Sequence, residues 1–159
     1  MKLIVLLYRY LLFYVKEVCL MYKRILVAVD GSENSKRAAQ HAAKLAALSK
    51  DTHVEIIFVQ DFEKIRSDVK QKPGTPDIDI ERKKRLAPIK GVFELPLVSH
   101  ELVIKQGDPG STIVSFANRG GFDLVVIGSR GLNSFQEMVI GSVSQKVAKK
   151  VNAPVMIVK

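Results

Sequence analysis

The chain has 159 residues, 47% hydrophobic and 26% charged, a balance typical of one folded globular domain and not of a disordered chain. Its one cysteine, Cys19, excludes an intrachain disulfide, and its three scattered histidines lack metal-ligand spacing, so we assign no metal-ligating residues. The formal charge is +9, but the basic residues form short clusters such as 82–85 and 149–150, which we interpret as solvated helix faces. The charge therefore does not favour a nucleic-acid partner.

The first twenty residues, "MKLIVLLYRYLLFYVKEVCL", differ in composition from the rest. They are apolar, but Arg9 interrupts them, and uncharged runs of about six residues are too short for a membrane-spanning helix of about twenty. We interpret residues 1–20 as an N-terminal extension, either an upstream start or a loosely attached helix, and residues 21–159 as the working domain. A helix lying on a membrane surface is the alternative.

Strands and helices alternate from Tyr22 onwards. The apolar run Arg24–Asp30 predicts a strand that is buried on both faces, and Val54–Gln60 predicts a second one. Between them, Ser32 is expected to cap a helix that runs to about Ser49. Its apolar stripe is formed by Ala38, Ala42, Leu45 and Ala46.

The segment 61–96 is expected to hold a loop at "KQKPGTPDID", residues 70–79, and then a polar helix from about Asp79. Pro88 and Gly91 should make this helix short or kinked. A third strand is predicted at His100–Gln106.

The next helix is clearly delimited. Asp108 is its expected N-cap, Pro109 occupies the first helical position, and Gly120 is the expected stop. A fourth strand, Phe122–Gly128, follows. A helix from Ser142 to about Asn152 and a fifth strand, Pro154–Lys159, complete the chain.

This βαβαβαβαβ pattern predicts an α/β fold, a single doubly wound domain with a five-stranded parallel sheet of order 3-2-1-4-5. The order reverses between the first and fourth strands, and in such sheets the carboxyl ends at the reversal form the usual ligand crevice. The segments Asp30-Gly31-Ser32 and Gly128-Ser129-Arg130-Gly131 are therefore expected to meet there.

The residue types in this crevice suit a nucleotide. Gly128 and Gly131 would allow close backbone approach and positive φ angles, and Arg130 would add positive charge. Gly141-Ser142 opens a helix whose free N–H groups attract phosphate, and the hydroxyls of Ser142 and Ser144 can donate hydrogen bonds.

Two further predictions concern the ribose of the nucleotide and a lid over the site. The carboxylate of Asp30 suits ribose hydroxyls, and residues 132–140 would form a lid or a short helix over the site. The alternative is purely structural: glycines are common at strand ends, and Ser142 would only cap a helix. The patterns GxxxxGK[ST] and GxGxxG are absent, which argues against ordinary kinases, GTPases and Rossmann dehydrogenases.

The segments "ILVAVDGSENSKRAAQHAAKLA", "QGDPGSTIVSFA", "FDLVVIGSRG" and "GSVSQKVAKKVNAPVMIVK" together resemble the universal stress protein family over about residues 22–159. The spacing Gly128-x2-Gly131-x9-Gly141-Ser142 looks like the signature of the ATP-binding branch of that family. The resemblance implies an adenine nucleotide alpha hydrolase-like fold and ATP, with or without Mg²⁺, as the ligand.

The resemblance also implies roles for individual residues. Ala28 and Val29 would line the adenine pocket, the Val59 backbone would meet adenine, and Asp30 would face the ribose. The remaining family positions, which would hold ribose and phosphates, are Ile127, Gly128, Arg130, Gly131, Gly141, Ser142, Val143 and Ser144.

The expected function is that of a cytoplasmic, nucleotide-dependent regulatory module of the stress response, acting as a homodimer through the last strand, Val155–Val158. The alternatives are a weak ATPase or phosphotransferase, for which Glu137 and Asp30 are candidates by position alone, and a cyclic-AMP-binding variant of the same pocket. No catalytic base is evident near the phosphates, so we do not expect an enzyme. A nucleic-acid or membrane partner is not favoured, because aromatic stacking platforms are absent.

Overall fold

A computed structural model describes residues 10, 22–61, 78–94, 97–131 and 140–159. Several predictions therefore lie wholly or largely outside the described residues. They are the extension 1–20, the loop 70–79, the lid 132–140 and the position of Glu137.

The protein has a central five-stranded parallel sheet of order β3-β2-β1-β4-β5, which confirms the predicted topology. Each strand begins and ends within two residues of its predicted bounds. The strands are β1 (Arg24–Val29), β2 (His53–Gln60), β3 (Ser99–Gln106), β4 (Leu124–Gly128) and β5 (Val155–Val158).

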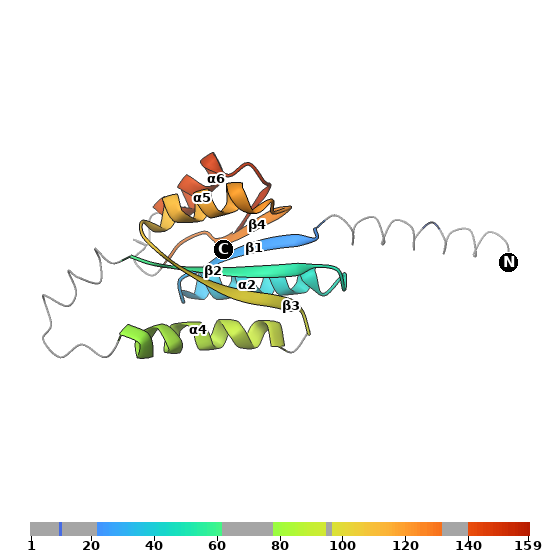
Figure 1. The fold of residues 1–159 in the computed structure, drawn as a ribbon, viewed down its shortest axis with the longest axis horizontal. Coiled ribbons are helices and arrows are strands. Elements are labelled where there is room, and N and C mark those ends of the chain that lie inside the picture. Colours follow the sequence, from blue (N-terminus) through green and yellow to red (C-terminus); the bar gives the residue numbers. More distant parts are fainter. Residues whose placement is uncertain (1–9, 11–21, 62–77, 95–96, 132–139) are drawn as a thin grey trace, which may run out of the picture.

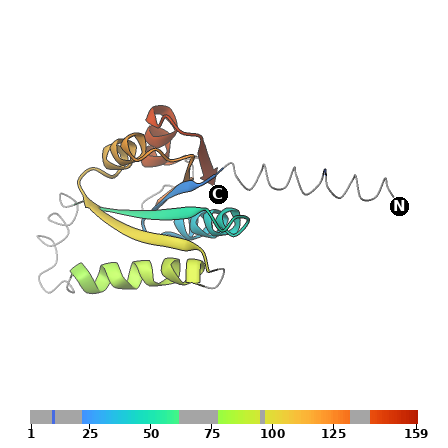
Figure 2. The ribbon, with the colours of Figure 1, turned by 45° about the vertical axis from the view of Figure 1, so that its right-hand side comes forward.

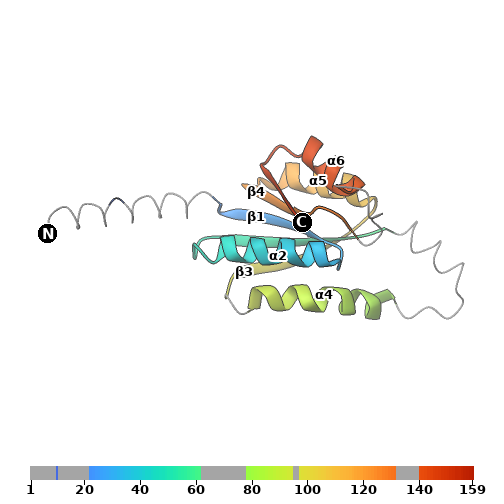
Figure 3. The ribbon, with the colours of Figure 1, turned by 180° about the vertical axis from the view of Figure 1, so that it is seen from behind.

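Helices cover both faces of the sheet (Figure 1). On one face lie α2 (Glu33–Ala46) and α4 (Ile78–Glu94), and on the other lie α5 (Pro109–Gly120) and α6 (Ser142–Lys150). Figure 2 shows the three layers, and Figure 3 shows α2 lying along the sheet beside α4. Among the helices that the structure describes, none is long and apolar enough to cross a membrane.

The strand β1 lies at the centre of the core because both of its faces are apolar. Ile25, Val27 and Val29 pack into the cluster under α2 and α4, whereas Leu26 and Ala28 pack into the cluster under α5 and α6. All five side chains are at most 5% exposed. Burial on both faces is why a continuous apolar run, and not an alternating one, encodes this strand.

The helix α2 begins as predicted but ends three residues early. The Ser32 hydroxyl accepts a hydrogen bond from the Ser35 amide at 3.2 Å and so caps the first turn. The last helical hydrogen bond runs from the Ala47 amide to the Ala43 carbonyl, and the Leu48 amide then bonds to the Leu45 carbonyl in a turn. The inner face is nearly all alanine, which lets α2 approach the sheet closely.

Of the prediction that Pro88 and Gly91 make α4 short or kinked, the part on length is wrong, because α4 is a continuous helix of 17 residues. Leu86, Ile89 and Phe93 share one face of the helix and are at most 3% exposed, so burial holds it to the core. Pro88 itself is exposed, so the proline ring does not disturb this buried face, although its missing N–H removes one hydrogen bond from the helix.

We expect Pro88→Ala to raise the free energy of unfolding by about 1–2 kcal/mol. Proline inside a helix costs up to about 3 kcal/mol relative to alanine, and its rigidity in the unfolded chain offsets part of that cost. Urea denaturation followed by circular dichroism measures the change. Gly91→Ala is the companion variant: a Cβ there meets nothing within 4 Å, so a gain of about 0.5–1 kcal/mol is expected. A loss of stability in Pro88→Ala would show that α4 needs the proline to dock.

The helix α5 begins as predicted at Asp108, whose carboxylate accepts a hydrogen bond from the Ser111 amide at 2.9 Å. Its end differs by one residue from the prediction, because Gly121 adopts the left-handed conformation (φ 64) and Gly120 is the last helical residue. The Lys146 ammonium group of α6 donates to Asp108 at 2.8 Å and links the two helices. This bond and those from Ser111 lower the pKa of Asp108 from 3.8 to about 2.

Replacing Asp108 with alanine is expected to cost about 1 kcal/mol at neutral pH, the usual value of an N-cap. Asp108→Asn keeps a capping oxygen but loses the charge, so it should cost less. Because the folded pKa is below the unfolded one, the charge contributes above the unfolded pKa of 3.8, and the contribution is lost as the pH falls through about 2. Thermal melts of the wild type and Asp108→Asn should therefore converge over this pH range. The difference at neutral pH should be small and shrink in high salt, since the Asp108 side chain is 59% exposed.

Candidate functional site

The candidate site lies where β1 and β4 are neighbours and their connections leave on opposite faces of the sheet. After β1 the chain enters α2 on one face, and after β4 the next described helix is α6 on the other face. The two strands pair in register up to Ala28 and Ile127. Their carboxyl ends therefore open the crevice that the sequence predicts.

The structure brings Asp30 and Gly131 together across this crevice. The Asp30 carboxylate accepts a hydrogen bond from the Ser32 amide at 2.9 Å. A Cβ on Gly131 would stand 2.6 Å from Oδ2 of the same carboxylate. The segment after β4 therefore passes directly over the acidic residue after β1, and a side chain at Gly131 would require the Asp30 carboxylate to move.

Gly128 allows a second close approach, between the end of β4 and the first turn of α2. A Cβ on Gly128 would stand 2.8 Å from the Asn34 carbonyl carbon. The Asn34 side-chain amide donates to the Arg130 carbonyl at 3.3 Å and so holds the loop after β4. Sequence reasoning missed Asn34, although its place in the first turn after the β1 crevice loop was a usable signal.

The prediction of positive φ angles at Gly128 and Gly131 is wrong. Among the described glycines, the positive φ angles are at Gly31 (85°), Gly107 and Gly121. Among the described residues of the crevice, the left-handed turn therefore lies at Gly31 after β1 and not at the glycines that end and follow β4. A Cβ on Gly31 would also stand 2.9 Å from Cβ of Arg85, so α4 packs against this turn.

The start of α6 completes the crevice. The Gly141 amide donates to the Ser129 carbonyl at 2.7 Å, which fixes this helix terminus beside the end of β4. Gly141 is the N-cap and has no side chain with which to cap the helix, whereas Ser32 caps α2 and Asp108 caps α5. The first amides of α6 therefore lack the N-cap side-chain acceptor that α2 and α5 have.

The two serines of α6 differ in their surroundings. Ser144 is 3% exposed, and its hydroxyl donates to the Gly128 carbonyl at 2.7 Å, which ties α6 to β4. Ser142 is exposed at the first helical position. In the structure, the hydroxyl free to face the crevice is thus that of Ser142, and Ser144 serves the packing of the helix.

The apolar candidates divide between the two faces of the sheet. The side chains of Ala28, Val59, Ile127 and Val143 belong to the α5 and α6 face. The Val29 side chain lies on the opposite face, so Val29 can contribute only backbone to a ligand on the α6 side. The β1–β2 pairing ends at Val29 and Phe58, and Val59 therefore extends past the end of β1.

A second group of polar side chains gathers at the opposite, amino-terminal ends of the strands. His53, Glu55 and Glu101 place potential metal-ligand atoms within 4.8 Å of one another. Sequence reasoning missed the group because its members come from two strands far apart along the chain, and only the β2–β3 register brings them together.

Comparison with known proteins identifies the family of this chain. The model of the universal stress protein family matches residues 21–159. Universal stress protein YxiE of Bacillus subtilis is 31% identical over 157 aligned residues, which span 87% of this chain and all of that protein.

Two solved structures share the fold. The structure of MJ0577, a universal stress protein of Methanocaldococcus jannaschii, superposes with a TM-score of 0.71 at 31% identity and covers 87% of this chain and 96% of that one. A universal stress protein of Archaeoglobus fulgidus in complex with dAMP gives a TM-score of 0.63 at 25% identity, over 87% of this chain and 99% of that one. The chain therefore belongs to the universal stress protein family.

Proposed function

We propose that the crevice between β1 and β4 binds an adenine nucleotide, with ATP, with or without Mg²⁺, as the expected ligand. The observation that carries this proposal is the start of α6: Gly141 places a helix terminus without a side-chain cap beside the glycine loop after β4. Free amides and the positive end of a helix dipole bind phosphate well. Arg130 lies in the same loop and adds positive charge.

The fold gives a reason for the other two glycines but none for Gly141. A Cβ on Gly128 would meet backbone and one on Gly131 would displace the Asp30 carboxylate, whereas a Cβ on Gly141 would be 3.5 Å from its nearest neighbours, an ordinary contact. The φ angle of Gly141, −73°, suits any residue. A glycine at this position therefore serves the approach of a ligand better than it serves the fold.

The nucleoside would lie towards the sheet. In this proposal Asp30 would accept hydrogen bonds from ribose hydroxyls, and the side chains of Ala28, Val59 and Ile127, which lie on the α6 side, would contact adenine. The dAMP complex of the Archaeoglobus fulgidus relative supports an adenine ligand for this chain.

The first experiment is to purify the protein without added nucleotide, denature it and identify released small molecules by anion-exchange chromatography with mass detection. Isothermal titration with ATP, dAMP and cyclic AMP, each with and without Mg²⁺, then ranks the ligands. Cyclic AMP is included because it also contains adenosine and is the alternative ligand for the same pocket. An empty protein that binds none of them at millimolar concentration would contradict the proposal.

We propose a regulatory role rather than turnover, in a cytoplasmic protein whose bound nucleotide changes its assembly. Asp30 accepts from the Ser32 amide and faces Gly131, an arrangement that suits ribose binding better than general-base chemistry. Weak ATPase activity remains the second candidate, for the same pocket. Phosphate release that is equal in the wild type and in a variant without nucleotide binding would identify the activity as contamination.

The proposed assembly is a homodimer through β5. In the part of the chain that the structure describes, this strand lies at one edge of the sheet and pairs with β4 alone, so its outer side is available to a second copy. Light scattering with and without ATP measures the mass and its dependence on nucleotide. A monomer at all concentrations would contradict this part of the proposal and leave nucleotide binding untouched.

A further inference from the structure

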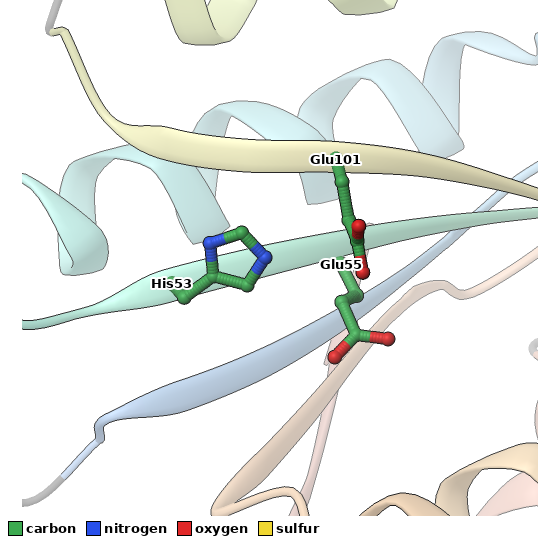
Figure 4. A group of neighbouring side chains, drawn as sticks. All are labelled: His53, Glu55 and Glu101. Carbon is green, nitrogen blue, oxygen red and sulfur yellow. The ribbon is translucent and has the colours of Figure 1, made fainter.

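The group formed by His53, Glu55 and Glu101 lies on the sheet face that also carries α5 and α6, but at the amino-terminal ends of the strands. His53 is the first residue of β2, and Glu55 is two residues further along, so the two side chains share a face. Glu101 of β3 is the register partner of Glu55. Figure 4 shows the three side chains converging, with one imidazole nitrogen directed towards the two carboxylates.

The His53 ring is already oriented for a ligand role. Its Nδ1 is 2.8 Å from the Ser99 hydroxyl, the residue opposite it on β3. When Nδ1 donates this hydrogen bond, Nε2 carries the free lone pair. The contact holds the ring in place, and a metal-binding histidine usually makes such an outer-shell hydrogen bond through its other ring nitrogen.

The Glu55 carboxylate is buried, and one of its two oxygens is bonded to Arg24. Glu55 is 6% exposed, and its Oε1 accepts from the Arg24 guanidinium at 2.5 Å. Arg24 is itself held by the Gly120 carbonyl and lies over the Phe122 ring, 4.9 Å from its centre. The guanidinium therefore fixes the direction of Glu55 through one oxygen and leaves the other for a second cation.

The charge of the group favours such a cation. Glu55 and Glu101 are directly opposite each other on neighbouring strands, a placement that is destabilising for like charges. Within the described part of the chain, Arg24 is the one ion-pair partner of Glu55, and Glu101 has none. A bound divalent ion would turn this repulsion into attraction for both carboxylates.

We propose that His53, Glu55 and Glu101 bind a divalent transition-metal cation, with Zn²⁺ as the probe. One imidazole nitrogen and two carboxylate oxygens form a donor set that suits Zn²⁺, with water completing the shell. Ligand atoms about 2.1 Å from a tetrahedral zinc ion lie about 3.4 Å apart. From the observed limit of 4.8 Å, the side chains must therefore close by up to about 1.4 Å, a movement that the exposed Glu101 side chain can make by rotation.

The test uses the full chain without a histidine tag, stripped of nucleotide and treated with a chelator that is then removed. Zn²⁺ is titrated by calorimetry into the wild type, His53→Ala and Glu101→Gln. The matched controls are His41→Ala and Glu94→Gln, which remove an exposed imidazole and an exposed carboxylate elsewhere. We expect one Zn²⁺ per chain in the wild type and in both controls, and at least tenfold weaker binding in His53→Ala and Glu101→Gln.

Thermal melts with and without Zn²⁺ give a second readout. Zn²⁺ should raise the melting temperature of the wild type and of the controls but not of His53→Ala, because a ligand that binds the native state stabilises it by mass action. Circular dichroism without metal establishes that the variants are folded. The proposal is overturned if the wild type takes up no stoichiometric Zn²⁺ at about 100 µM, or if His53→Ala binds as well as His41→Ala. It is also overturned if Cys19→Ser removes the binding, which would place the ion elsewhere.

Discussion

Gly141→Asp is expected to lower the affinity for ATP by at least about 100-fold while leaving the fold intact. Aspartate is a favoured N-cap residue, and at a φ of −73° with no close neighbour it fits this position without strain. Its carboxylate would accept from the first amides of α6 and occupy the place of the phosphates. Two like charges about 4 Å apart repel by about 4 kcal/mol at an effective dielectric constant of about 20, and screening leaves a large part of this cost.

The neutral variant Gly141→Asn separates charge from bulk. Asparagine caps the helix equally well but brings no charge, so its affinity for ATP should fall between those of the wild type and Gly141→Asp. Titration calorimetry gives the affinities, and thermal melts should show both variants at least as stable as the wild type. If both variants bound ATP like the wild type, the start of α6 would not be the phosphate site.

Gly128→Ala and Gly131→Ala are poorer tests because they confound binding with packing. A methyl group at Gly128 would meet backbone atoms of Asn34, and one at Gly131 would press on the Asp30 carboxylate. A loss of ATP binding in either variant could follow from a displaced loop alone. Gly141 is the better test because the packing around this position does not require a glycine.

The topology was predictable because its determinants are local. Each buried strand is a short apolar run, and Ser32 and Asp108 are N-cap residues that mark the starts of two helices. The alternation of strands and helices then predicts a parallel sheet. The position of the crevice follows from the sheet order. Asp30, Gly128 and Gly131 could therefore be brought together from the sequence alone.

Apart from Asn34, the features that sequence reasoning missed depend on long-range packing. The persistence of α4 through Pro88 depends on the burial of Leu86, Ile89 and Phe93, which a local helix-breaking rule does not include. The engagement of the Ser144 hydroxyl with β4 depends on how closely α6 approaches the sheet.

The prediction of which glycines adopt positive φ angles was wrong for the same reason. A glycine that is needed for close approach and one that is needed for a positive φ angle look the same in a sequence. The structure assigns the first role to Gly128 and Gly131 and the second to Gly31. Only the neighbours of each position distinguish the two.

Phe93 is the residue whose truncation should cost the most stability in α4. It is fully buried in the core cluster with Leu86 and Ile89, and its ring centre is 5.4 Å from that of His100 on β3. Phe93→Ala removes this contact and leaves a cavity, so we expect the free energy of unfolding to fall by about 3–5 kcal/mol. That is a large share of the roughly 5–15 kcal/mol that holds a domain of this size together.

Urea denaturation of Phe93→Ala, followed by circular dichroism, should show a midpoint lowered by roughly 2 M at a slope of about 2 kcal/mol per M. Leu48→Ala is the matched control, since Leu48 is 58% exposed and its truncation should change stability by less than about 0.5 kcal/mol. An effect of Phe93→Ala no larger than that of Leu48→Ala would mean that α4 is not held by its buried face. The consequence would reach the crevice, because α4 carries Arg85, whose side chain packs on Gly31 beside Asp30. A helix that is weakly docked would leave the turn after β1 without this support, and the loss should then appear as weaker nucleotide binding in Phe93→Ala but not in Leu48→Ala.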